Sequence, residues 1–550
     1  MSERAPSAAR TSSSPRAWVG ALLGLVLLAW LIVRSRFLID DAFISFRYAQ
    51  NWAEGLGPVY NPGVDPPVEG YSNFLWVALL ALGAKLGALP EVVSHLLSIA
   101  AAASVLLLTH LVLLRRMRLD GWSAGLATLA LAALPPFHVW ATSGLETALY
   151  GLFLFGSWTL LTAPTGDREL RVGLLAGLCG AGLVLTRVEG FLWVAGILVA
   201  STVTGHLTRR RVLAYLGVAW GVMLVHLLWR HSVYGEWVAN TVHAKAGLSG
   251  LTLARGGRNL ATFALLFLWP VVALAAPLLS RGTERHRLVL STWIVVLGAL
   301  GYNLGVGGDW MPMFRFLAPA APFLALLLGS LLARVPLAPR VGFGAAAVVL
   351  SLLPSFDVHL APQALRERVY FRTFLVGYET EWRRLEIARG NAAARKRLGL
   401  ALGQVLRPGE TWTGAAIGAT GYYSGVHVLD RNGLVNRSVA QREVEPGGGT
   451  AGHEKRVPRS WFRDEEPSFY EVFIVPRFAP RNSPAFANDV HQIGVTIFEK
   501  QEESDLRDCT VIERREARDI EGLPARSSIL LLKHTDDQAR ARSFWQRFGH

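Results

Sequence analysis

Long runs of apolar residues, separated by short polar breaks, fill the first 355 residues of the chain. A helix needs roughly 20 apolar residues to cross a bilayer, and several of these runs are shorter than that. The pattern predicts a bundle of spanning helices over residues 17–355. Twelve runs are candidates: 17–33, 71–87, 92–114, 122–140, 145–162, 172–186, 190–205, 212–229, 260–280, 288–304, 316–333 and 341–354.

Basic residues between the runs decide how many of them cross, because cytoplasmic loops carry an excess of Lys and Arg. If 71–87 crosses, nearly all basic clusters fall outside; if it lies along the outer membrane surface, all fall inside. We therefore predict eleven spanning helices, a cytoplasmic N-terminus, and juxtamembrane helices at about 42–54 and 71–87 in the first outer loop. The clusters are Arg115, Arg116, Arg118, Arg168, Arg171, Arg209, Arg210, Arg211, Arg281, Arg285, Arg287, Arg334 and Arg340.

The two ends of the chain have a different composition. Residues 1–16 are polar, basic and rich in Ser and Ala, which predicts a disordered cytoplasmic segment. Residues 356–550 read as one soluble α/β or α+β domain on the outer face, with a helical stretch over 361–404. Gly, Pro and Asn turns separate the β-like runs that follow, at 411–419, 426–430, 469–476, 495–500, 509–516 and 528–534.

Composition agrees with a membrane protein, since 51% of residues are hydrophobic and only 17% are charged. The net charge of +14 reflects the basic clusters that set topology. No zinc-finger spacing and no compact basic helix is present, which argues against nucleic-acid binding. The two cysteines, Cys179 and Cys509, form no CxxC motif and offer no disulfide framework.

Two adjacent carboxylates, Asp40 and Asp41, follow the first apolar run. One interpretation is structural, because Asp is a good N-cap and a helix is expected from Ala42. The other is chemical, because two close carboxylates can raise the pKa of one of them and provide a base, or can bind a metal. The predicted topology puts the pair on the outer face, together with most other charges that do not set topology.

Further outer polar residues allow similar alternatives. Arg187 and Glu189 fill a short break between two apolar runs, either as a turn with an ion pair or as part of a site. Lys245 and Arg315 place positive charge outside, either as snorkelling side chains or as ligands for an anion near the membrane surface. In the Gly-rich stretch 445–455 there is no GxxxxGK[ST] motif, and we expect its His453 at the surface.

Several segments resemble the bacterial GT-C glycosyltransferases, and among them the terminal arabinofuranosyltransferase-like proteins of cell-wall arabinan synthesis. The resemblance runs over about residues 38–455 and rests on the order and spacing of the motifs. These are DDAFISFRYAQNWAEGLGPVYNPG, VEGYSNFLW, SGLETALY, TRVEG, YGEWVANTVHAKAG, GGDWMPMFRFLAP and IGATGYYSGVHVLDRNGLVN.

The resemblance implies a polytopic α-helical membrane protein of GT-C type with an extracytoplasmic C-terminal α/β domain. It also implies a polyprenyl-phosphate sugar donor, a glycan or lipid-linked acceptor, a bacterial cytoplasmic membrane location, and Asp40 or Asp41 as catalytic base. Further positions that match the motifs are expected to bind donor or acceptor: Arg47, Glu69, Tyr71, Glu146, Arg187, Glu189, Asn240, Lys245, Asp309 and Arg315.

The chemistry of such a transfer fits these residue types. An acceptor hydroxyl is a poor nucleophile and needs a base such as Asp41 or Asp40. The departing polyprenyl phosphate needs positive charge, for which Lys245, Arg187 and Arg315 are candidates. Asp309 is expected to hold the sugar, or to join Asp41 in holding a divalent cation such as Mg²⁺ or Mn²⁺.

Two other classes of protein compete with a transferase. A transporter or flippase of lipid-linked sugars would carry polar residues at mid-membrane and internal repeats, whereas the polar residues here gather at one face. A non-catalytic membrane scaffold whose tail binds glycans would need no outer carboxylates. We therefore favour the transferase.

Overall fold

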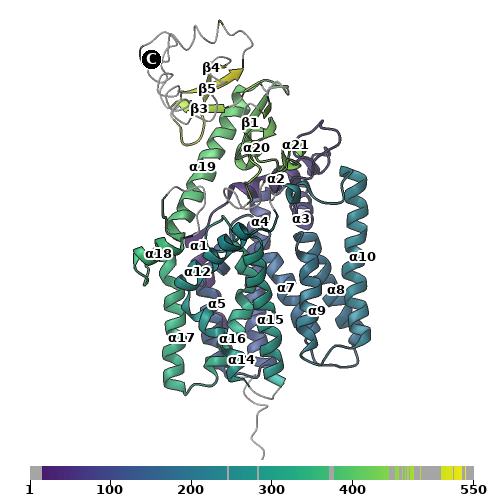
Figure 1. Ribbon diagram of the computed structural model, residues 1–550, viewed down its shortest axis with the longest axis vertical. Coiled ribbons are helices and arrows are strands. Elements are labelled where there is room, and N and C mark those ends of the chain that lie inside the picture. Colours follow the sequence, from purple (N-terminus) through teal and green to yellow (C-terminus); the bar gives the residue numbers. More distant parts are fainter. Residues whose placement is uncertain are drawn as a thin grey trace, which may run out of the picture.

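The computed structural model describes most of the chain up to residue 457 and short pieces beyond it. Long helices run side by side through one end of the molecule, and the C-terminal strands lie at the other (Figure 1). Residues 1–14 and the predicted strand 495–500 lie outside the described residues. Those described are 15–244, 247–280, 284–370, 377–444, 452–457, 461–462, 465, 468–469, 471–475, 484, 510–523, 526–534 and 539.

Seven helical stretches of the described chain are long and apolar enough to cross a membrane, and a bent pair makes an eighth. The protein is therefore a multi-pass membrane protein. The seven lie in α1 (Pro15–Ser35), α4 (Pro90–Leu111) with the π-helical Val112–Arg116, α8 (Glu169–Thr186), α10 (Arg209–Tyr234), α15 (Glu284–Gly305), the 3-10 turn Arg315–Ala320 with α16 (Ala321–Leu332), and α17 (Leu337–Leu352) with the 3-10 turn Leu353–Phe356. The bent pair is α5 (Gly121–Ala133) and α6 (Pro135–His138), which continues into the 3-10 turn Val139–Ala141.

The predicted number of eleven spans stays a prediction, because three apolar helices are shorter than a straight span. These are α3 (Phe74–Lys85), α7 (Thr147–Leu161) and α9 (Gly190–Thr202). The apolar run 260–280, which we expected to span, is divided among α12 (Gly250–Leu266), α13 (Leu268–Ala273) and α14 (Ala276–Leu279). Pro270 and Pro277 interrupt this run, since proline removes a backbone donor and disfavours a continuous helix.

Small residues let the spanning helices approach closely, as is usual in membranes. Gly20 of α1 faces Gly125 of α5, where a Cβ on Gly20 would lie 2.3 Å from the Gly125 Cα atom. On α8, Gly173 and Gly177 face α10 in the same way, since a Cβ on either would lie 2.7 and 3.0 Å, respectively, from α10 backbone atoms. These contacts hold the bundle that carries the site at its end.

The chain between α1 and α4 contains both expected helices, α2 (Asp40–Ala53) and α3. The expected N-cap role of the Asp pair is wrong, because α2 begins at Asp40 itself and Ile39 is its N-cap without a side-chain hydrogen bond. Both carboxylates therefore lie in the first turn, where the helix dipole favours negative charge.

The C-terminal part contains two sheets among its described residues. Strand β1 (Thr411–Gly414) pairs in parallel with β2 (His427–Asp430), and the antiparallel sheet has the order β3-β5-β4. The predicted strand 411–419 ends at Gly414, because the next residues enter α20. The remaining elements are α11 (Asn240–His243), α18 (Gln363–Val369), α19 (Glu381–Val405), α20 (Gly418–Ser424), α21 (Arg437–Ala440), β3 (Glu471–Val475), β4 (Thr510–Arg518) and β5 (Arg526–His534).

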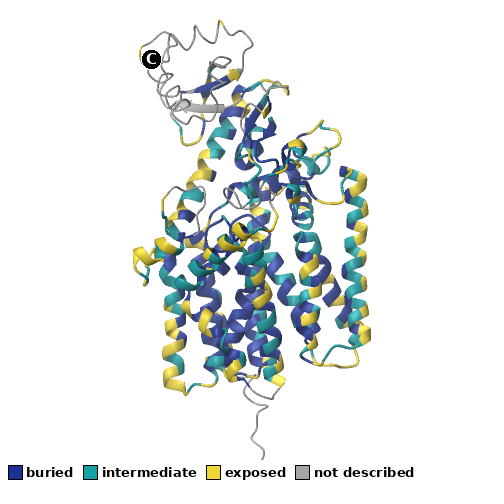
Figure 2. Cartoon of the chain, viewed as in Figure 1, coloured by how far each residue is buried: buried dark blue, intermediate teal, exposed yellow. Residues whose placement is uncertain are grey.

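The C-terminal part and the first outer loop share one hydrophobic core. Side chains of α2 and α3, such as Phe43 and Val77, belong to the same buried cluster as Leu385 of α19 and Ala419 of α20. In Figure 2 the ribbon is dark blue, the colour of buried residues, where α2 and α20 meet. Arg47 ties the parts together, because its guanidinium donates to the carbonyls of Tyr60, Gly421 and Val426 at 2.7 to 2.8 Å. The C-terminal part is thus packed directly against α2.

Candidate active site

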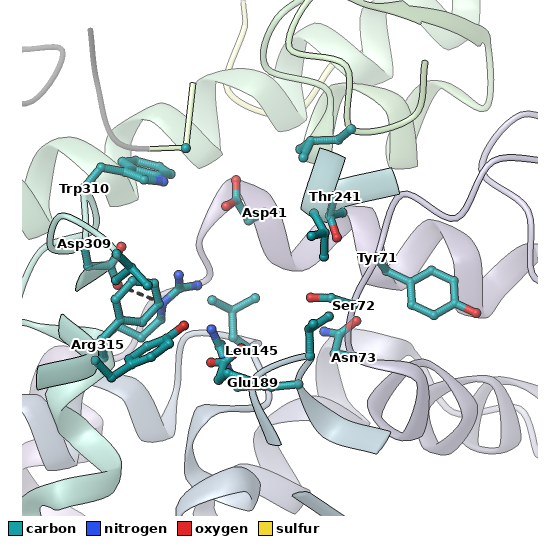
Figure 3. A pocket seen from close by; sticks show the side chains of 18 of the residues that line it. Asp41, Tyr71, Ser72, Asn73, Leu145, Glu189, Thr241, Asp309, Trp310 and Arg315 are labelled. Atoms are coloured by element: carbon teal, nitrogen blue, oxygen red, sulfur yellow. Dashed lines mark hydrogen bonds and ion pairs between the residues drawn. The ribbon is translucent and has the colours of Figure 1, made fainter. Parts of the chain in front are cut away.

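A pocket of about 480 Å³ lies where α2 meets the ends of the long helices (Figure 3). Its walls come from α2, the loop before α3, the turn between α8 and α9, the end of α15 and the segment 452–454. Seven of the expected site residues line it: Asp41, Tyr71, Glu146, Arg187, Glu189, Asp309 and Arg315.

The two adjacent carboxylates have different surroundings. Asp41 faces the pocket, is partly exposed there, and makes no recorded hydrogen bond within the described part of the chain. Asp40 is buried, accepts a hydrogen bond from the Ala419 amide at 2.9 Å, and forms an ion pair with Arg395 at 3.6 Å. Only Asp41 is therefore placed to meet a ligand.

The position of Asp41 raises its pKa to about 6. Burial is the largest cause and the negative charge of Asp40 the next, while the charge of Arg315 acts in the opposite direction. A carboxyl group with a pKa near 6 is a stronger base than an ordinary aspartate and is still mostly deprotonated at neutral pH. This is the separation of roles that paired carboxylates allow.

Arg187 is held between two carboxylates. Its Nη1 donates to Glu146 at 2.6 Å, and its Nε donates to Glu189 at 2.5 Å. Glu146 also accepts from the Asn73 side chain at 2.9 Å. The ion pair between Arg187 and Glu189, one of the two alternatives that the sequence left open, is present, and both residues also line the pocket.

Arg315 and Asp309 form the other charged pair of the pocket. Arg315 Nε donates to Asp309 Oδ2 at 2.9 Å, and its guanidinium carbon lies 4.9 Å from the centre of the Phe316 ring. Asp309 also accepts from the Met311 amide. Among the residues that the structure describes, no hydrogen bond is recorded from the two Nη nitrogens of Arg315. These nitrogens are available to an anion.

Four expected site residues lie behind the pocket wall or beyond the described chain. Arg47 joins α2 to the C-terminal part, as described above. Glu69 pairs with Arg230 at 2.6 Å. Asn240 donates from its amide group to the carbonyls of Gly433 and Leu434. Lys245 lies outside the described residues.

Tyr71 borders the pocket, but its ring points away from the cavity and its hydroxyl lies 3.1 Å from that of Tyr234 (Figure 3).

Several pocket residues were not predicted from the sequence. Trp310 follows Asp309 in the motif GGDWMPMFRFLAP, and this position next to an expected site residue could have indicated it. Arg255 of α12 and Glu454 form an ion pair at 2.8 Å, and nothing in their local sequence indicates it. His453, expected at the surface, lines the pocket instead and packs edge-on to Trp310 with ring centres 5.2 Å apart.

The donor set does not fit a metal site. Within the described residues, no group of three or more His, Cys, Asp and Glu side chains is placed to hold a metal ion. Asp309, one of the two expected ligands, is already engaged by Arg315. The reaction proposed below uses no metal ion, and the binding of a divalent cation stays a prediction.

The fold is similar to that of a protein of known structure. The chain is similar to ArnT from Cupriavidus metallidurans bound to undecaprenyl phosphate, at 13% identity and a TM-score of 0.52, covering 94% of this chain and 98% of that one. It is similar to the apo state of the same protein at 14% identity and a TM-score of 0.51. The chain therefore shares the fold of this solved protein, and the superfamily that its motifs imply stays a resemblance.

Comparison of sequences narrows the resemblance. The chain is 29% identical over 359 residues to the terminal beta-(1→2)-arabinofuranosyltransferase of Mycobacterium tuberculosis (strain ATCC 25618 / H37Rv). The match covers 56% of this chain and 56% of that protein, so it spans little more than half of each. Residues 380–511 match a family model described as "Domain of unknown function (DUF8728)".

Proposed function

We propose that the chain is a membrane glycosyltransferase that moves a sugar from a polyprenyl-phosphate donor to a glycan or glycolipid acceptor of the cell envelope. The observation that carries the proposal is Asp41, a base with a pKa of about 6 in a pocket that also contains Arg315. The printed name of the mycobacterial relative makes an arabinofuranosyl donor the first to test.

Asp41 acts as general base in a single displacement. It takes the proton of the acceptor hydroxyl while that oxygen attacks the anomeric carbon of the donor sugar. The bond from this carbon to the phosphate oxygen breaks on the opposite side, so the anomeric configuration inverts. The polyprenyl phosphate leaves with the electron pair and one more negative charge.

Arg315 is the better candidate for binding this phosphate than Arg187. The positive charge of Arg187 is already balanced by Glu146 and Glu189, and a phosphate would have to displace one of them. Arg315 shares only its Nε with Asp309 and keeps two nitrogens for a bidentate contact. Lys245, which follows α11 in the sequence, is the second candidate.

The proposed function also implies a location and an orientation in the membrane. The pocket opens at the end of the bundle that the basic clusters assign to the outer side. We propose that the protein lies in a bacterial cytoplasmic membrane, with its N-terminus in the cytoplasm and its C-terminal part outside. The acceptor then arrives from the envelope and the donor from the outer leaflet.

The decisive experiment substitutes each of the paired carboxylates in the full-length protein. Asp41→Asn should lower kcat by at least about 10²-fold, the usual contribution of a general base, while leaving donor binding in place. Turnover is followed by mass analysis of product formed from a synthetic prenyl-phosphate sugar.

Asp40→Asn serves as the matched control, because it keeps the side-chain size and affects a carboxylate that does not line the pocket. It should reduce stability more than kcat. Near-normal turnover by Asp41→Asn would overturn the base assignment. Binding of the donor without turnover by the unchanged chain would favour a flippase, and neither binding nor turnover would favour a scaffold.

A further inference from the structure

A short segment from the C-terminal part closes one wall of the pocket. Gly452, His453 and Glu454 line the cavity. The segment is fixed just beyond, where the Val457 amide donates to the Arg431 carbonyl at 2.9 Å. Val457 is also buried in a small apolar cluster with Leu429, Val439 and Phe462. The position of Glu454 is therefore set by packing.

One carboxylate oxygen of Glu454 has no partner within the described part of the chain. The side chain is only 3% exposed, and its Oε1 accepts from Arg255 Nη2 at 2.8 Å. Its Oε2 is buried and has no hydrogen-bond partner among the residues that the structure describes. A buried acceptor without a partner is costly. Because Glu454 lines the pocket, a ligand hydroxyl that reaches this oxygen would recover that cost.

The surroundings indicate which ligand group this is. A carboxylate oxygen accepts a hydrogen bond from a hydroxyl and repels a phosphate, so the donor's phosphate does not belong here. Trp310 and His453 present flat rings at the same wall. Such rings combine an apolar face with a polar edge, as a sugar ring does. Together they form a surface for a neutral sugar.

The location separates acceptor from donor. In Figure 3, Trp310 lies on one side of Asp309 and Arg315, and Leu145 and Glu189 lie on the other. Leu145 and Glu189 belong to the ends of the membrane helices, from which a lipid-linked donor enters. The wall with Trp310 and Glu454 is completed by the C-terminal part, which extends away from those helices (Figure 1).

We propose that Glu454 binds the acceptor, accepting through Oε2 a hydrogen bond from a hydroxyl of a neutral glycan whose ring packs on Trp310. This deepens the proposed function and rests on it. Arg255 is a positioning residue, because its Nε also donates to the Gly307 carbonyl at 3.2 Å and so joins Glu454 to the loop that carries Asp309 and Trp310.

The test compares Glu454→Gln with Glu443→Gln in the full-length protein in lipid nanodiscs. Glu443 is exposed and outside the pocket, so it is the matched control. The probes are farnesyl-phosphate arabinofuranose as donor and an arabinofuranose disaccharide as acceptor. Glu454→Gln should raise the acceptor KM about tenfold or more, the effect of losing a hydrogen bond to a charged group.

The donor KM and kcat of Glu454→Gln should stay within about twofold, since the donor and Asp41 are not touched. Thermal unfolding checks that the variant folds. An unchanged acceptor KM, or an equal rise in the donor KM, overturns the proposal. If the unchanged chain shows no turnover, the proposed function fails, and disaccharide binding is measured by saturation-transfer NMR instead. Binding lost in Glu454→Gln then supports the subsite; equal binding by both, or none by the unchanged chain, overturns it.

Discussion

At the scale of single residues, Asp40 and Asp41 divide two tasks. Asp40 is turned toward α20 and Arg395, so its charge is used to hold the fold. Its charge also raises the pKa of Asp41, which faces the pocket. The neighbour in sequence thus serves the reacting group without touching the ligand, and a change at Asp40 should alter the pH dependence of Asp41.

The pKa of Asp41 predicts how the reaction depends on pH. Because the base must be deprotonated, kcat/KM should rise about tenfold per pH unit below pH 6 and level off above about pH 7. Asp40→Asn removes a negative neighbour, so the inflection should move to lower pH. An initial-rate profile from pH 4.5 to 8.5 checks both expectations, and an inflection that is absent or unmoved would contradict them.

The raised pKa of Asp41 also makes the stability of the folded chain depend on pH. The folded chain holds the Asp41 proton more tightly than an unfolded chain with a pKa of 3.8, so the contribution of this group to stability is full below pH 4 and is lost as the pH rises through about 6. A deprotonated Asp41 therefore costs stability at neutral pH, as is common where a site is arranged for chemistry.

The sequence predicts single residues well where chemistry is concentrated in one motif. Asp41, Asp309 and Arg315 could be chosen because their residue types match the reaction and their positions follow apolar runs. Arg255 and Glu454 could not, because their contact joins positions 199 residues apart and depends on how the C-terminal part packs. Arg47 was expected at the ligand for its motif, whereas its donors serve backbone carbonyls.

At the scale of elements, the contact between α2 and α20 sets the position of the Asp pair. Gly418 begins α20 directly against the start of α2, where a Cβ would lie 1.8 Å from the Asp40 carbonyl oxygen. No side chain fits there without moving α2. Helix α2 was expected from the sequence, but α20 was not, because residues 411–419 were expected to form a strand. The close approach was not predicted either, since a lone glycine gives no such signal.

Gly418→Ala should therefore displace α2 and weaken the fold. We expect a loss of about 1–3 kcal/mol, which overpacking usually costs, together with reduced turnover. Thermal unfolding in detergent measures the first and product formation the second. Gly390→Ala is the control, because Gly390 is exposed on α19 with no atom within 4 Å of its added Cβ. That variant should be neutral or slightly more stable, whereas equal effects at both positions would argue against the close contact.

At the scale of the whole molecule, the amino-acid composition indicates two separate parts, whereas the packing joins them in one core. The change near residue 356 predicts a separate outer domain, yet α19 and α20 complete the core around α2. Sequence periodicity reports which face of an element is apolar but not which distant element covers it. The change in composition near residue 356 could therefore be recognised in the sequence, but the shared core could not be predicted from it.

A chain ending at residue 355 should lack an active site. Removing the C-terminal part exposes apolar faces of α2 and leaves the buried Arg47 without the carbonyls of Gly421 and Val426. Trypsin should then cleave after Arg47 in the shortened chain, while the full-length protein is cut at exposed positions such as Arg383 and protected at Arg47. Peptide mass analysis measures this, and turnover or protection at Arg47 in the shortened chain would contradict it.

The joining of α2 to α20 also has a consequence for the order of synthesis. Arg47 and the Gly421 carbonyl that it binds are 374 residues apart. At 5–20 residues per second, the ribosome needs about 20 to 75 s to cover that distance. During this time α2 has left the ribosome but lacks its partner. The Asp pair therefore gains its contacts with α20 only after residues 418–424 have been made.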